Sequence, residues 1–139
     1  MRVVIQLQEY AENLRLSKEE WDDQVMQEML NTATLATVYS NDVLSFQKEY
    51  NDQKGDLHLM ANVVSATVVE KGFTIEEALE KIMKEATDYE LRTEQLIQHL
   101  ENKHDVSEDM KRFLIGVGYN IGGTWYIGKT NERYYNTFI

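Results

Sequence analysis

The sequence lacks both cysteine and proline among its 139 residues. Without cysteine the chain can form neither a disulfide framework nor a thiolate zinc site. Cysteine usage therefore does not indicate whether the protein works in an oxidising or a reducing compartment. Without proline, helices can run far without an interior break. There is also no apolar run of membrane-spanning length and no signal-peptide pattern. We therefore expect a cytoplasmic protein without a transmembrane segment.

Positive charge is also scarce. The chain has 14 lysine and arginine residues against 24 acidic ones, for a net charge of −10. This balance argues against nucleic acid or an anionic membrane as a partner, because both carry negative charge themselves. It would also repel a diphosphate substrate, unless metal ions and local cations intervene.

What the chain does have is apolar residues at helical spacing. Hydrophobic residues make up 42% of the sequence, and its length suffices for one domain, 1–139, with a real core. The pattern predicts an all-α protein, an antiparallel helical bundle without strands. The expected helices span residues 3–14, 21–50, 56–71, 75–100 and 108–129.

Local start and stop signals support these helices. Ser17 with Glu20, and Thr74 with Glu77, form capping boxes, while Ser107 or Asp105 is expected to cap the last helix. Gly55 is expected to end the helix over 21–50, and Gly72 the helix over 56–71. Because neither glycine nor proline occurs between residues 17 and 55, we expect one continuous helix over 18–50.

The most informative segment is a row of polar residues near the end of that helix. Asn41, Ser45 and Glu49 stand at positions i, i+4 and i+8, so on a helix their side chains share one stripe. An amide oxygen, a hydroxyl and a carboxylate are ligands for a hard divalent cation. One carboxylate suits Mg²⁺, which completes its shell with water and substrate phosphate.

The alternative is that these residues are an ordinary solvated helix face. Such a pattern should arise by chance in roughly one chain of this size in a few hundred. In addition, the same stripe carries Met26 and Leu30 further back, so the inward side of the helix turns polar where Asn41 arrives. Buried polar groups need partners, and a metal ion would be one.

Glycine is concentrated in the last helix. Each glycine there should cost about 1 kcal/mol relative to alanine. Close helix packing is the favoured explanation, and cavity space beside aromatic side chains is the other. The residues concerned are Gly116, Gly118, Gly122 and Gly123, with Tyr119, Trp125 and Tyr126 nearby.

Together these features resemble the carboxy-terminal half of a class I terpene cyclase of the microbial type. The segment Asn41-Asp42-x-x-Ser45-x-x-Lys48-Glu49 is similar to that family's second metal-binding motif, and the ending with Arg133-Tyr134 is similar to its terminal helix. The resemblance covers essentially the whole chain. It implies the carboxy-terminal half of an α-helical class I terpenoid synthase fold.

The resemblance also implies roles for individual residues. Asn41, Ser45 and Glu49 would bind one Mg²⁺. Lys48, Arg133 and Tyr134 would hold the diphosphate, with Arg133 and Tyr134 as catalytic residues at the leaving group.

An aromatic cavity wall is expected as well, because a carbocation needs a dry pocket. Trp125 is the best candidate for contact with the substrate, with Tyr119 and Phe46 behind it. Asp42 lies one residue off the stripe. We expect it to support the site through a neighbouring helix.

One part of the family pattern is missing. The aspartate-rich motif for two further Mg²⁺ ions and the diphosphate-sensing arginine are not found. Asp22-Asp23 is the only adjacent aspartate pair, and it lies 19 residues before Asn41, roughly 28 Å away along one helix. The missing ligands would come from a second chain, from an absent amino-terminal half or from a homodimer.

The expected function is therefore that of a Mg²⁺-dependent lyase, a terpene synthase that ionises and cyclises a linear isoprenyl diphosphate. The resemblance favours farnesyl diphosphate and a sesquiterpene product. A chain-elongating transferase fits less well, because it would carry a second aspartate-rich motif at Asn41. The alternative from another class is a non-catalytic helical module that pairs with another chain.

Overall fold

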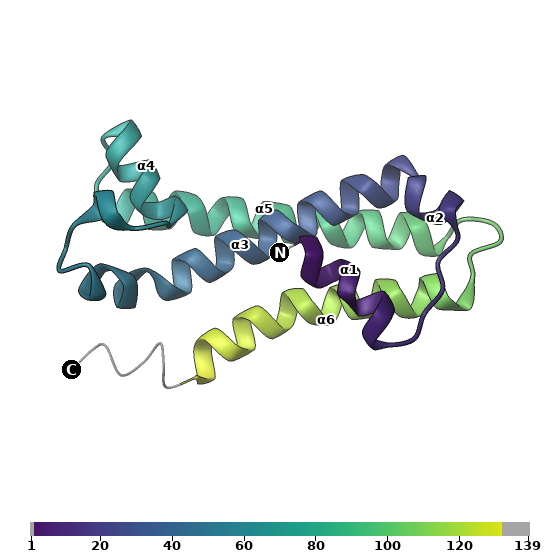
Figure 1. Ribbon diagram of the computed structural model, residues 1–139. Coiled ribbons are helices and arrows are strands. Elements are labelled where there is room, and N and C mark those ends of the chain that lie inside the picture. The colour runs from purple at the N-terminus through teal and green to yellow at the C-terminus, as the bar shows by residue number, and fades with distance from the viewer. Residues whose placement is uncertain (1, 132–139) are drawn as a thin grey trace.

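Three long helices form the frame of this computed structural model, which describes residues 2–131. They are α3 (Gln24–Asp52), α5 (Ile75–Glu101) and α6 (Glu108–Thr130). Helices α3 and α5 run antiparallel along most of their length, and α6 turns back beside them (Figure 1). No strand occurs within residues 2–131, so the predicted all-α fold is confirmed.

Four short elements complete the fold: α1 (Arg2–Ala11), α2 (Lys18–Asp22), the 3₁₀ turn η1 (Leu57–Leu59) and α4 (Val63–Lys71). Helix α1 contacts both α3 and α6 near the middle of the molecule, whereas α4 packs at the far end of α3 and α5 (Figure 1). The predicted helices 75–100 and 108–129 are confirmed to within one residue at each end.

The predicted caps are also present. Ser17 and Thr74 each close a complete capping box, and Ser107 accepts the Met110 amide hydrogen bond at the start of α6. Gly72 ends α4 in the left-handed region at φ 70°, where glycine is favoured because it has no Cβ. These short-range signals correctly place the helix ends.

The prediction of one continuous helix over 18–50 is wrong at its start. Asp23 has extended dihedrals (φ −60°, ψ 129°) and separates α2 from α3. Its carboxylate accepts hydrogen bonds from the amides of Val25 at 2.8 Å and Met26 at 3.1 Å, and it pairs with Lys103. Asp23 therefore starts a new helix as its N-cap. From there α3 is continuous through Asn41, Ser45 and Glu49.

Two further boundaries also differ from expectation. The predicted helix 56–71 is interrupted, because η1 ends at Leu59 and the chain is extended at Met60 and Asn62 before α4 begins. The first helix ends at Ala11 rather than at residue 14. Asn13 follows it with φ 52°, a left-handed conformation that a helix cannot continue through.

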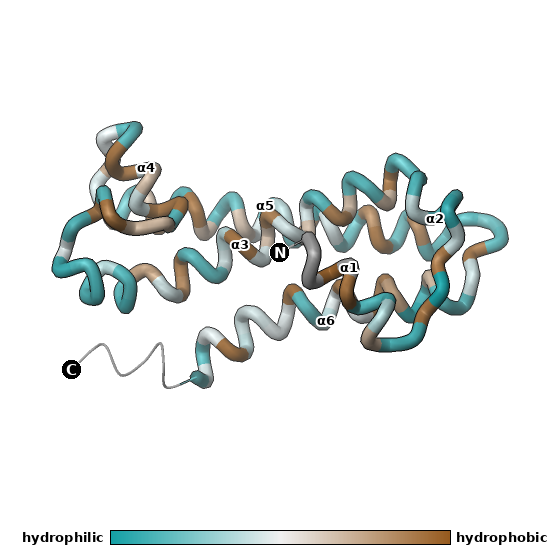
Figure 2. The backbone as a smooth tube through the Cα atoms, viewed as in Figure 1, coloured by the Kyte–Doolittle hydropathy of each residue, from teal (hydrophilic) through white to brown (hydrophobic). Residues whose placement is uncertain are grey.

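The buried apolar residues form two clusters at opposite ends of the long helices. Amphipathic patterning of these helices is visible in the alternation of apolar and polar positions (Figure 2). Among the described residues no helix is both long and apolar enough to cross a membrane. The larger cluster contains Ile5, Leu14, Met26, Met29, Leu30, Ala33, Leu96, Leu100, Met110, Phe113, Leu114 and Val117. The smaller one contains Phe46, Val64, Ala78 and Ile82.

Polar contacts also connect the long helices. The hydroxyls of Thr32 on α3 and Thr93 on α5 lie 2.9 Å apart. Closer to the smaller cluster, Glu90 accepts hydrogen bonds from the Ser40 hydroxyl at 3.2 Å and from the Trp125 indole N–H. A single carboxylate on α5 thus connects α3 with α6.

A close contact between α1 and α6 depends on Gly116. The Gln8 side chain donates to the Phe113 carbonyl at 3.0 Å and accepts from Asn120 at 3.1 Å. A Cβ at Gly116 would overlap the Gln8 amide, whereas a Cβ at Gly118 would meet nothing within 4 Å. Gly116 therefore fits the close-packing explanation for the glycines of this helix.

This difference gives a stability test. We expect Gly116→Ala to lower the free energy of unfolding by about 1–3 kcal/mol, because the buried Gln8 amide must move and lose its partners. The matched variant Gly118→Ala should instead gain up to about 1 kcal/mol from helix propensity. Urea unfolding followed by circular dichroism measures both. Equal stability of the two variants would contradict the Gln8 contact.

Candidate functional site

The candidate site lies on the second half of α3, where its inward side turns polar. Met26 and Leu30 are fully buried, and Ser45 is still only 4% exposed. Asn41 and Glu49 are half-buried. The change from apolar to polar along one helix side therefore occurs where the sequence predicted it.

Ser45 and Glu49 form the closest pair of candidate ligands. The Ser45 hydroxyl donates to Glu49 Oε1 at 2.6 Å. Helical side chains lean toward the amino terminus, so Glu49 reaches back one turn. Neighbouring oxygens around Mg²⁺ are about 2.9 Å apart when the metal–oxygen bonds are about 2.05 Å. The spacing and chemistry of this pair fit one edge of a Mg²⁺ shell.

The second oxygen of Glu49 is held from another helix. Asn62, at the start of α4, donates to Glu49 Oε2 at 3.1 Å and to the Asp42 carbonyl at 2.9 Å. Across residues 2–131, Glu49 takes part in no ion pair. Its carboxylate is thus oriented by two neutral donors and keeps its charge available for a cation.

Asp42 makes the contact to a neighbouring helix that we expected of it. Its Oδ2 accepts the backbone amide hydrogen bond of Val63 at 2.7 Å. Burial raises the pKa of Asp42 above its usual value, while the Val63 hydrogen bond lowers it and the charge of Glu49 raises it. Asp42 therefore joins α3 to α4, and its carboxylate is directed at Val63 on α4.

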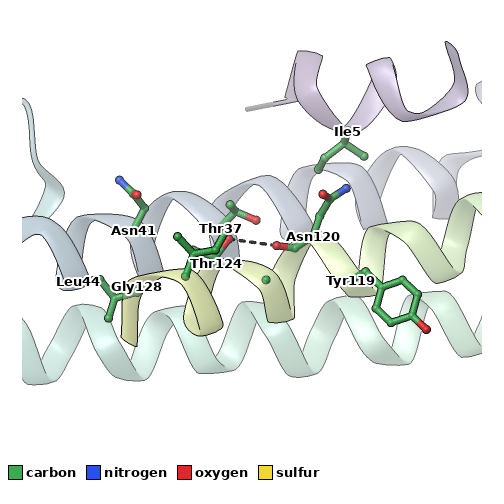
Figure 3. Close-up of a pocket in the computed structure, with 10 residues that line it drawn as sticks. Ile5, Thr37, Asn41, Leu44, Tyr119, Asn120, Thr124 and Gly128 are labelled. Atoms are coloured by element: carbon green, nitrogen blue, oxygen red, sulfur yellow. Dashed lines mark hydrogen bonds between the residues drawn. The ribbon is translucent and has the colours of Figure 1, made fainter. Parts of the chain in front are cut away.

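Asn41 faces a different space from Glu49. It lines a cavity of about 290 Å³ between α1, α3 and α6, together with Ile5, Thr37, Leu44, Tyr119, Asn120, Gly123, Thr124, Ile127 and Gly128 (Figure 3). Glu49 lines a separate hollow with Gln53, Leu59, Met60 and Ala61. The structure thus brings Ser45 and Glu49 together, whereas Asn41 and Glu49 line different hollows.

The glycines of α6 divide between the two explanations. Gly123 lines the cavity, and a Cβ there would meet nothing within 4 Å. A Cβ at Gly128 would overlap the Leu44 side chain on α3. Gly123 thus leaves space, while Gly128 allows the end of α6 to approach α3.

The expected aromatic wall is present only in part. Tyr119 lines the cavity, but Trp125 is not among the residues around it. The Trp125 indole N–H donates to Glu90, and Lys129 Nζ lies 5.7 Å from its ring centre. Phe46 stacks on Tyr50 within the smaller apolar cluster.

The predicted cations are placed as follows. Lys48 forms an ion pair with Asp52, one turn further along α3. Arg133 and Tyr134 lie outside the described residues, so their expected approach to Lys48 and Glu49 stays a prediction.

The acidic residues near the start of α3 do not form a second metal site. Asp23 is the N-cap of α3, and Asp22 pairs with Lys18 at 2.5 Å. Over residues 2–131, no group of three or more His, Cys, Asp or Glu side chains could hold a metal ion. The polar row on α3 contains a single carboxylate, Glu49, and is not such a group either, so it stays a candidate on its spacing and oxygen ligands alone.

Sequence reasoning missed Asn62 as a member of the site. An asparagine before the apolar pair Val63-Val64 is a typical N-cap signal, which could have placed the helix start there. It missed Thr37, Asn120 and Thr124 as well, since their place around the cavity depends on how α6 packs against α3.

Comparisons with known proteins indicate the family of this chain. The family model "Terpene synthase family 2, C-terminal metal binding" matches residues 1–92, a range that includes α3 and Asn62 and ends within α5. The chain is 31% identical over 100 residues to the bifunctional type I diterpene synthase tndC of Aspergillus flavipes, covering 68% of this chain and 13% of that protein.

A second relative is the terpene cyclase braA of Annulohypoxylon truncatum, which is 25% identical over 130 residues. That alignment covers 91% of this chain and 33% of the relative. The chain thus spans a third or less of the length of the curated relatives it matches. No solved structure matches it. Because the family model matches residues 1–92, more than half of the sequence, this chain belongs to the C-terminal metal-binding family of terpene synthases.

Proposed function

We propose that this chain is the carboxy-terminal part of a Mg²⁺-dependent class I terpene synthase. The reaction is that of a carbon–oxygen lyase, in which a linear isoprenyl diphosphate ionises, cyclises and releases diphosphate. The observation that carries the proposal is the Ser45–Glu49 pair at 2.6 Å on the helix that also lines the cavity beside Asn41.

The chain's own residues have separate tasks in this proposal. Glu49 and Ser45 hold the cation, and Asn41 joins them when its side chain turns from the cavity. Bound Mg²⁺ would supply positive charge to the leaving diphosphate. Lys48, at the same end of α3, adds a second cation, and Arg133 and Tyr134 add a third cation and a hydrogen-bond donor.

The cavity beside Asn41 is the proposed place for the isoprenoid chain. Its lining is mostly apolar, with Ile5, Leu44 and Ile127 contributing aliphatic surface and Tyr119 an aromatic ring. Tyr119 and Ile127 are exposed in this chain, so in this proposal a covering second chain or half-domain excludes water, and the Tyr119 ring stabilises a cation by cation–π attraction. Farnesyl diphosphate is the proposed substrate, and the diphosphates one isoprene unit shorter and longer are tested beside it, since one relative is named a diterpene synthase.

A non-catalytic helical module that pairs with another chain is the second candidate. It is favoured by large apolar side chains exposed on α6: Ile115, Tyr119, Tyr126 and Ile127. Surfaces of this kind are typical of interfaces. The two proposed functions differ in one measurable property: whether this chain, once paired with its partner chain, turns over an isoprenyl diphosphate.

We expect the isolated chain to form little or no cyclic product. The single metal motif would bind one Mg²⁺ ion, so the two further Mg²⁺ ions and the diphosphate-sensing arginine of the family pattern would be missing. The loss of even one electrostatic stabiliser typically costs about 10²–10³-fold in rate. A chain bearing an aspartate-rich helix should restore activity. Gas chromatography of volatile products after incubation with Mg²⁺ and each isoprenyl diphosphate measures this. Full turnover by the monomeric 139-residue chain would contradict the expectation.

In the complemented protein, we expect Glu49→Gln to lower turnover by at least about 10²-fold. The amide keeps the shape and the Ser45 contact but removes the only carboxylate among the three proposed ligands. Glu70→Gln, at an exposed position of α4, is the matched control and should leave turnover unchanged. A fully active Glu49→Gln protein would exclude the proposed metal site.

Lys48 gives a binding test that does not need catalysis. We expect Lys48→Met to weaken the binding of inorganic pyrophosphate with Mg²⁺ at least about tenfold, because a charge-assisted contact is lost. Lys18→Met removes a similar i,i+4 ion pair with an aspartate, far from the site, and should have no effect. Isothermal titration calorimetry compares the two variants. Equal losses would mean that only the overall charge matters.

A further inference from the structure

Asn62 uses both ends of its side-chain amide in the structure. It is only 5% exposed, and its Oδ1 accepts the Val64 amide hydrogen bond at 2.9 Å, which caps α4. Its Nδ2 faces α3 and donates to the Asp42 carbonyl at 2.9 Å and to Glu49 Oε2 at 3.1 Å. One side chain thus connects the first turn of α4 to the carboxylate of the motif.

Helix capping alone does not require asparagine at this position. Serine, threonine and aspartate also accept a backbone N–H at an N-cap. None of them has the two amide hydrogens that asparagine can donate. What asparagine adds is the pair of contacts toward α3, and one of these ends on Glu49.

We propose that Asn62 is a positioning residue for the metal-binding carboxylate, holding Glu49 from the side opposite Ser45. The inference rests on the proposed function, in which Glu49 binds Mg²⁺. Ser45 bonds Oε1 and Asn62 bonds Oε2, so the plane of the carboxylate is fixed while each oxygen keeps a lone pair for the cation. Losing such an orienting partner typically weakens metal binding about 10–100-fold.

A second contact makes the role of Asn62 separable from the docking of α4. The Val63 amide donates to Asp42 Oδ2 at 2.7 Å, so α4 stays attached to α3 when Asn62 is changed. Asn62→Ser and Asn62→Thr keep an N-cap oxygen, but both side chains are shorter and carry no amide donor to Glu49.

Ser65→Ala is the matched control. The Ser65 hydroxyl bonds the carbonyls of Asn62 at 3.1 Å and Met60 at 3.2 Å. Its loss weakens the same first turn of α4 without touching Glu49. Both kinds of variant should lower thermal stability, but only the Asn62 variants should change metal affinity.

The experiment titrates the ¹⁵N-labelled full chain with MnCl₂ and follows paramagnetic broadening of the backbone amides of residues 45–49. We expect saturable broadening in the wild type, a need for about tenfold more Mn²⁺ in Asn62→Ser and Asn62→Thr, and wild-type behaviour in Ser65→Ala. Broadening at the exposed acidic start of α5 should be equal in all four proteins and reports non-specific binding.

Each other outcome is decisive. Equal Mn²⁺ affinity of the wild type and the Asn62 variants would overturn the positioning role and leave the metal site standing. Loss of the α4 amide signals in both Asn62 variants would make the residue structural and overturn it too. If the wild type shows no saturable broadening at residues 45–49, the proposed metal site itself is wrong, and this inference is overturned with it.

Discussion

Helix α3 must bury one side along most of its length, although that side is apolar at one end and polar at the other. Buried polar groups are costly without partners, and each buried hydroxyl on α3 has one in reach. Thr32 meets Thr93, Ser40 meets Glu90 and Ser45 meets Glu49, while Thr37 bonds the Ala33 carbonyl of its own helix. Within the described residues, no buried side-chain nitrogen or oxygen lacks a partner. The place of α5 beside α3 satisfies this requirement for Thr32 and Ser40, and α3 itself satisfies it for Thr37 and Ser45.

The long helices could be predicted because local signals and periodicity agree on them. Helices α5 and α6 have clear caps and a sustained amphipathic pattern, and their ends were predicted to within one residue. The breaks at Asp23 and at Met60–Asn62 were missed because neither contains glycine or proline. In both places a short polar side chain bonds the backbone of the following helix, which competes with helical continuation. Such a competition is decided by tertiary contacts such as Asp23 with Lys103.

For the site, sequence reasoning worked within one helix and failed between helices. The spacing of Ser45 and Glu49 was enough to bring them together, because helix geometry alone decides it. Asn62 could not be found this way, since its contact with Glu49 depends on where α4 docks. Trp125 was expected beside the substrate but bonds Glu90 instead. Which side of α6 faces the cavity depends on a packing angle that no local pattern encodes.

The two apolar clusters have a consequence for how the protein opens. The larger cluster has twelve buried side chains and the smaller one four, although partly buried apolar side chains pack against both. Buried apolar area is the main source of local stability, so the end that carries the metal motif is the weaker one. In native-state hydrogen exchange, the amides of α4 and of the adjoining ends of α3 and α5 would exchange together, and they would do so before the amides of the other helices. The end with the candidate metal motif would then loosen and re-form while the opposite end keeps the helices in register.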